Sequence, residues 1–176
     1  MEKEKLPEDI REELKYLGKD DFILILALGK KPSFELEVQK RAIILSKILG
    51  IELDFVPYKF GYYSEQITEK LNDERLGYLI SRNDKKYKLT EMGQKAYDHL
   101  LEQLKAKNKE DVAQFLESLS KLNEDDLLAL TYHLFPESMI ESEIKERVKK
   151  RIETLKKESP FESRIEKDRI VIEINS

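Results

Sequence analysis

Apolar positions recur at helical spacing through most of the chain. Residues 22–28 are continuously apolar, which predicts a helix buried on several sides, and Asp20 and Asp21 are placed to cap it. A stripe from Leu36 to Leu49, stopped by Gly50, predicts a helix over 35–49. Ser64 is placed to cap a helix over 64–76, and Thr90 to cap a long one that follows. Residues 7–17, between Pro7 and Gly18, predict a short N-terminal arm.

Two other patterns break the helical spacing in the first part of the chain. Residues 78–82 and 86–89 fit short strands turned at Asn83 and Asp84, which tolerate tight turns. Residues 51–63 hold Pro57, Gly61 and several aromatic side chains, and we expect an ordered connection there. The succession of three helices, a hairpin and a helix over residues 20–108 predicts the winged-helix variant of the helix-turn-helix.

The last third of the chain is predicted to be a helical extension. Apolar stripes fall in 112–119 and 127–134, Asn123 can cap the second helix, and Pro136 ends it. A basic-ended helix over 138–157 and a strand over 168–175 follow. That strand must pair with the hairpin, with a further strand, or with a second copy of the chain. The predicted fold is mainly α with a small β-hairpin (α+β), divided into an arm (1–19), a winged-helix domain (20–108) and an extension (109–176) that could serve dimerisation.

Composition narrows the function classes. The chain has no cysteine, which excludes disulfides, thiolate nucleophiles and cysteine zinc sites. Charged residues make up 39% of it, and abundant Lys and Glu resemble thermophilic composition. We expect a cytoplasmic protein without a signal peptide or membrane span. Because the net charge is −4, any basic surface for nucleic acid must be local.

Short motifs spread over about half the chain resemble a known family. They are Val38-Gln39-Lys40, Phe60-Gly61-Tyr62-Tyr63-Ser64, Leu76-Gly77-Tyr78-Leu79-Ile80 and Leu89-Thr90-Glu91-Met92-Gly93. These look like winged-helix proteins of the YwgA-like and Panacea (SocA-like antitoxin) type, and residues 127–142 are similar to the helical tail of some archaeal relatives. The relatives carry basic residues before the Gln-Lys pair, where this chain has Phe34-Glu35-Leu36-Glu37, which argues against phosphate contact at that end.

A DNA-binding reading assigns the helix over 64–76 to the major groove and the hairpin to the minor groove or backbone. The helix also carries Glu65, Glu69, Asp73 and Glu74, so it has two more acids than bases, whereas Asp84 is the only acid of the hairpin. Gln66, Lys70 and Asn72 are predicted to lie nearest the bases. The full set of candidate contacts is Ser64, Gln66, Thr68, Lys70, Asn72 and Arg75 on the helix, and Arg82, Lys85, Lys86 and Lys88 on the hairpin.

Two other function classes were weighed. Aromatic residues 55–63 could form a partner-binding surface, as in an antitoxin-like or scaffold module without DNA. Catalysis has the least support, because His99 and His133 have no partner nearby in sequence and no phosphate loop, metal spacing or nucleophile motif occurs. We therefore expect a non-enzymatic, homodimeric transcriptional regulator that binds double-stranded DNA, with no cofactor, no metal and no membrane contact.

Overall fold

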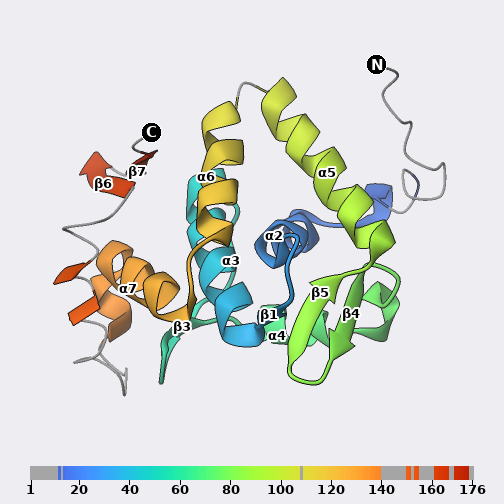
Figure 1. The fold of residues 1–176 in the computed structure, drawn as a ribbon, viewed down its shortest axis with the longest axis horizontal. Coiled ribbons are helices and arrows are strands. Elements are labelled where there is room, and N and C mark those ends of the chain that lie inside the picture. The colour runs from blue at the N-terminus through green and yellow to red at the C-terminus, as the bar shows by residue number, and fades with distance from the viewer. Residues whose placement is uncertain are drawn as a thin grey trace.

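The computed structural model describes residue 12 and residues 14–107, 109–139, 150–151, 153–154, 161–166 and 169–174. Helix α2 (Lys19–Leu28) forms the centre of the core, since residues 23–28 are all buried. It lies between α3 (Glu35–Leu49) and α5 (Glu91–Ala106), as Figure 1 shows. The predicted helices over 20–28 and 35–49 are therefore confirmed, the second of them ending at left-handed Gly50.

A small antiparallel sheet packs beneath these helices. It has the strand order β1-β5-β4, formed by β1 (Ser33–Phe34), β4 (Ile80–Asn83) and β5 (Lys86–Leu89). Strands β4 and β5 pair from Ile80 with Leu89 to Asn83 with Lys86, and Asp84 turns the chain with a positive φ of 58°. The predicted hairpin is confirmed, while the pairing of residues 33–34 with β5 was not predicted.

The aromatic connection between α3 and the next helix contains a hairpin of its own. Strands β2 (Val56–Tyr58) and β3 (Gly61–Tyr63) pair with each other, so the prediction of an ordered connection missed two strands. Gly61 has a φ of 89°, and a Cβ there would lie 2.9 Å from the Tyr132 ring. The hairpin is thus held close to helix α7 (Glu124–Leu134).

Helix α4 (Glu65–Leu71) is shorter than the predicted helix over 64–76. It stops at Asn72, and a separate 3-10 turn, η1 (Glu74–Leu76), begins at Asp73, whose carboxylate accepts from the backbone N–H of Arg75. The local hydrogen bond of an Asp side chain competes with helix continuation, which explains the early end.

The contact between α5 and residues 78–79, which lead into β4, gives a physical reason for the Leu-Thr-x-x-Gly spacing. Thr90 caps α5 by accepting from the Gly93 N–H, and its hydroxyl donates to the Tyr78 carbonyl over 2.5 Å. A Cβ on Gly93 would lie 2.2 Å from the Leu79 carbonyl oxygen. A residue with a side chain at position 93 would therefore push α5 away from β4.

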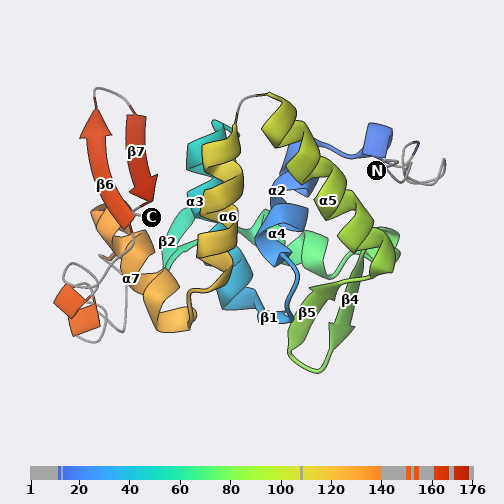
Figure 2. The same ribbon diagram turned by 45° about the horizontal axis from the view of Figure 1, so that its top comes forward.

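The C-terminal third is helical as predicted and ends in paired strands. Helix α6 (Glu110–Ser120) precedes α7, which Asn123 caps, and a short turn, η2 (Pro136–Met139), follows. Strand β7 (Arg169–Ile174) pairs with β6 (Phe161–Glu166), which the sequence analysis did not predict (Figure 2). Most of the predicted N-terminal arm and of the helix over 138–157 lies outside the described residues.

Taken together, the protein has a mainly helical α+β fold with a three-stranded antiparallel sheet and two-stranded hairpins. The fold class predicted from the sequence is confirmed. Among the described residues, no helix has the length and apolarity needed to span a membrane.

Candidate nucleic-acid interface

The start of α4 is fixed by a buried side chain from α3. The Gln39 amide nitrogen donates to the Ser64 carbonyl over 2.8 Å, and its amide oxygen accepts from the Ser64 N–H over 2.9 Å. Ser64 itself is fully buried, and its hydroxyl accepts from the Ile67 N–H. The expectation that Ser64 lies on an outward face is therefore wrong, because capping the helix places this residue beneath α3.

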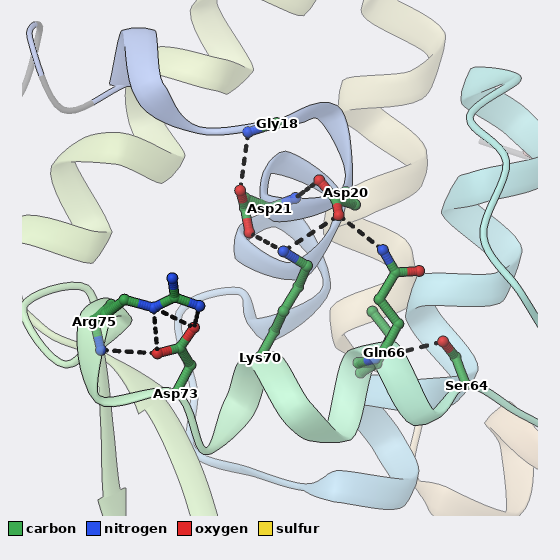
Figure 3. A network of polar contacts seen from close by, with 9 residues as sticks. Gly18, Asp20, Asp21, Ser64, Gln66, Lys70, Asp73 and Arg75 are labelled. Carbon is green, nitrogen blue, oxygen red and sulfur yellow. Dashed lines mark hydrogen bonds and ion pairs between the residues drawn. The ribbon is translucent and has the colours of Figure 1, made fainter.

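Gln66 and Lys70 lie one turn apart on α4 and point toward the start of α2 (Figure 3). The Gln66 amide donates to Asp20 over 2.8 Å. The Lys70 ammonium lies 2.6 Å from Asp21 and 3.2 Å from Asp20. Two of the three predicted base-reading side chains are thus used within the fold.

The charges of this cluster stabilise one another. Partial burial alone would lower the pKa of Lys70, but hydrogen bonds and attraction from Asp21 and Asp20 outweigh it, so the pKa is raised. Burial would likewise raise the pKa of Asp20, and the contact with Lys70 lowers it instead. Lys70 therefore stays charged, but the carboxylates of Asp20 and Asp21 balance its charge. Less positive potential then remains at this position to attract phosphate.

The three remaining candidates of this region are all engaged within the fold, although two of them are exposed. Asn72 donates from its amide to the Thr68 carbonyl, and its amide oxygen accepts from Arg82 over 3.1 Å and from the Tyr87 hydroxyl over 3.2 Å. Arg75 lies in η1 and not in α4. Its guanidinium donates to both carboxylate oxygens of Asp73, which makes a bidentate contact (Figure 3). Thr68, partly buried, donates to the Glu35 carboxylate.

The exposed residues of α4 itself are mostly acidic. Glu65, Glu69 and Asn72 are exposed along it, and Glu74 is exposed in η1. Carboxylates repel the phosphate backbone, so this surface is a poor match for a DNA groove.

The hairpin of β4 and β5, called the wing from here on, carries the opposite charge. Arg82, Lys85, Lys86 and Lys88 are all exposed. No carboxylate of the described residues pairs with any of these lysines. The wing is therefore a local basic surface on a chain whose net charge is −4.

The four wing cations do not share one face. Side chains alternate along a strand, so Lys86 and Lys88 lie on the outer face of the sheet, opposite buried Tyr87 and Leu89. The Lys86 ammonium lies 5.0 Å from the centre of the exposed Phe34 ring, which is on the neighbouring strand. Arg82 lies over the Tyr87 ring at 5.4 Å and reaches Asn72, and so belongs to the α4 side.

Sequence reasoning missed the residues that organise this region. Asp20 and Asp21 were interpreted as helix caps, and Asp21 does accept from the Gly18 N–H over 2.9 Å, but their contacts with α4 span 46 to 50 positions. Gln39 lies in the short motif Val38-Gln39-Lys40, for which the sequence predicted no structural role. Local pattern gave no signal that Gln39 or Asp20 would contact α4.

No group of three or more potential ligands that could hold a metal ion occurs in the part of the chain that the structure describes. No protein-family model, no curated protein and no solved structure matches this chain.

Proposed function

We propose that the chain is a winged-helix DNA-binding protein acting as a transcriptional regulator, and that it contacts DNA mainly through the wing. The observation that carries this proposal is the set of exposed lysines at positions 85, 86 and 88, which have no carboxylate partner in the described residues. Exposed cations without a carboxylate partner can replace the counterions of phosphate, which provides sequence-independent affinity.

The order of elements supports the winged-helix assignment. Helices α2, α3 and α4 precede the β4–β5 hairpin, and β1, which follows α2, pairs with β5. A helix-turn-helix followed by a hairpin is the winged variant of this motif. Here the β2–β3 hairpin lies between α3 and α4. It makes the connection between these helices longer than the short turn of a simple helix-turn-helix.

The proposed contacts differ from those that the sequence suggested. Lys85, Lys86 and Lys88 contact phosphates from the turn and the outer sheet face, while Arg82 and Asn72 lie where the wing meets α4. Gln66 and Lys70 serve to hold α4 on α2. Phosphate contacts position a protein on DNA, whereas base contacts specify the site. We therefore expect strong salt dependence and weak sequence preference.

Fluorescence anisotropy with labelled fragments from upstream of the protein's own gene tests the proposal. Measured at about 50 and about 200 mM salt, the affinity should fall steeply, because counterion release dominates. Absence of binding at the lower salt concentration would reject DNA as the partner.

A second function is favoured by a different observation. The β2–β3 hairpin leaves Val56, Tyr58 and Phe60 exposed, at 56%, 50% and 38% of their surface. Clustered exposed apolar side chains mark protein interfaces. If DNA is not bound, an antitoxin-like or scaffold module that binds a protein partner through this hairpin becomes the better proposal. Replacing Val56 and Tyr58 with Ser would then abolish copurification of that partner without affecting the fold.

Homodimerisation is also part of the proposal, but strand β7 does not require it. Strand β7 pairs with β6 of the same chain, so its pairing requirement is met without a second copy. Sedimentation equilibrium would decide between a monomer and a dimer of the 20.8 kDa chain.

A further inference from the structure

A pocket of about 160 Å³ lies between the first turns of α3 and the β2–β3 hairpin. Its exposed lining is almost entirely apolar, and it is bordered by Leu36, Tyr58, Phe60, Tyr62 and Tyr63 together with Glu35, Gln39, Lys40 and Gly61. A cavity of about 150 Å³ lined by apolar side chains accommodates one benzene ring. The pocket therefore has the size and lining for a single six-membered aromatic ring.

Lys40 gives this pocket an unusual charge. The side chain is 2% exposed, and its ammonium donates one hydrogen bond, over 2.7 Å, to the Tyr62 carbonyl. An ammonium has three donors, and no carboxylate of the described residues pairs with Lys40. Burial lowers the pKa of Lys40 to about 7, because a charge removed from water without a counter-ion is unfavourable.

Glu35, the other charged residue at the pocket, is better satisfied. Its carboxylate accepts a hydrogen bond from the Thr68 hydroxyl, and it is only partly buried. It precedes Lys40 by five positions on α3, which places the two Cα atoms about 7.5 Å apart along the helix axis. The charged group without a counter-ion among the described residues is therefore Lys40, and the ligand that would complete the site is an anion.

We propose that this pocket binds a small aromatic carboxylate, with its ring among Tyr58, Phe60 and Tyr63 and its carboxylate paired with Lys40. The ligand supplies the counter-ion that the described residues do not provide and displaces water from an apolar surface. This proposal is independent of DNA binding, since none of its residues belongs to the wing.

Nuclear magnetic resonance titration of the full chain with benzoate, benzyl alcohol and benzylamine tests the proposal. All three carry the same ring, so differences in affinity report the charge preference of the site. Benzoate should bind at least about tenfold more tightly than either analogue and shift the amide signals of residues 56–63. No shift of these signals by benzoate up to about 10 mM, or equal affinity for benzylamine, would overturn the proposal.

Two variants at the charged positions should act in opposite directions. Lys40→Met keeps a similar volume without charge, and replacing a buried charge by an apolar side chain is generally tolerated. It should remove the preference for benzoate over benzyl alcohol. Glu35→Gln keeps an acceptor for Thr68 and should tighten benzoate binding, because it removes a like charge. An unchanged preference in Lys40→Met, or weaker benzoate binding in Glu35→Gln, would contradict the proposed pose.

A third variant checks the ring contact without touching either charge. Phe60 is 38% exposed, so Phe60→Ala should leave the fold intact and weaken all three ligands by a similar factor. If Lys40→Met fails to fold, this variant and Glu35→Gln still decide the question. Benzoate affinity that Phe60→Ala leaves unchanged would show that the ring binds elsewhere, and would overturn the proposal.

Discussion

The helical region of α2, α3 and α4 and the wing of β4 and β5 both carry cations, but they use them differently. In the helical region Lys40 is buried against a carbonyl, Arg41 donates to the Ala27 carbonyl, and Lys70 is paired with Asp21. In the wing the lysines are exposed and have no carboxylate partner in the described part of the chain. The fold supplies a partner for Arg41 and Lys70, buried Lys40 has no counter-ion among the described residues, and the wing lysines are exposed to an external ligand.

This difference shows why counting charges along a sequence is a weak guide to a binding surface. Gln66 and Lys70 satisfy the residue types expected of a DNA-reading helix, yet the face that bears them packs on α2. A strand alternates its side chains, so the wing lysines at positions 86 and 88 necessarily share the face opposite buried Tyr87. The proposed DNA binding therefore depends on the exposed cations that have no carboxylate partner in the described part of the chain.

The largest expected effect is in the wing. Replacing Lys85, Lys86 and Lys88 with Ala should lower the salt slope of DNA binding by about 2.7 and the affinity at 50 mM salt by on the order of a thousandfold, because three phosphate contacts are lost. Anisotropy titrations over a range of salt concentrations measure both. The matched control replaces three exposed lysines at positions 95, 105 and 107 with Ala, which changes the net charge equally. Equal losses in the two triple variants would show that overall charge, not the wing, determines binding.

A second prediction concerns the buried cation of the helical region. The pKa of Lys40 is about 7 in the folded chain against 10.5 for an ordinary lysine. At pH values between these two pKa values, Lys40 is protonated in the unfolded chain and deprotonated in the folded chain. The free energy of unfolding therefore rises with pH. The slope approaches about 1.4 kcal/mol per pH unit, giving roughly 2 kcal/mol between about pH 7.5 and 9.5.

Urea denaturation across that range measures the slope, and Lys40→Met is its control. The variant should lose the Lys40 contribution, because it has no proton to exchange. An identical slope in both proteins would mean that Lys40 is not the group responsible. Burial raises the pKa of Tyr62 and Tyr97 above the ordinary value of 10.0, so these two groups contribute a small slope of opposite sign near the upper end of the range. Comparison with Lys40→Met, which keeps both tyrosines, removes that contribution.

The elements on which both regions rest could largely be predicted from the sequence. Helix α3 and the β4–β5 hairpin follow from local periodicity and from Gly50 and Asp84 at their ends. The contacts that decide the site could not, since Gln39 meets Ser64 across 25 positions and Asp21 meets Lys70 across 49. A local pattern shows that a residue is polar, but it does not show which distant group will satisfy it. The early end of α4 was missed for a related reason, because Asp73 caps a new turn instead of continuing the helix.

A third prediction tests whether α4 needs its anchor on α2. Asp21→Asn removes one charge of the Lys70 pair, whose side chains are 13% and 21% exposed. We expect a loss of about 1–2 kcal/mol in the free energy of unfolding, since a hydrogen bond between charged, partly buried groups is lost. The control is Asp98→Asn, which removes an exposed contact with Lys30 and should cost less than about 0.5 kcal/mol. Equal costs would mean that the anchor contributes no more than a surface ion pair.

The smallest expected effect separates a wing-mediated contact from insertion of α4 into a groove. Glu65 and Glu69 are exposed on α4, and if that helix entered the major groove their carboxylates would lie close to phosphate. Because we place the contact on the wing, Glu65→Gln with Glu69→Gln should tighten DNA binding by less than about threefold at 50 mM salt. The same change at exposed Glu91 and Glu102 of α5 gives the effect of net charge alone.

If the α4 variant binds more than about tenfold more tightly than this control, the phosphates lie near α4, because only local repulsion depends on position. The acidic helix would then be a groove-reading element held in a weakly binding state, and the two regions would form one interface.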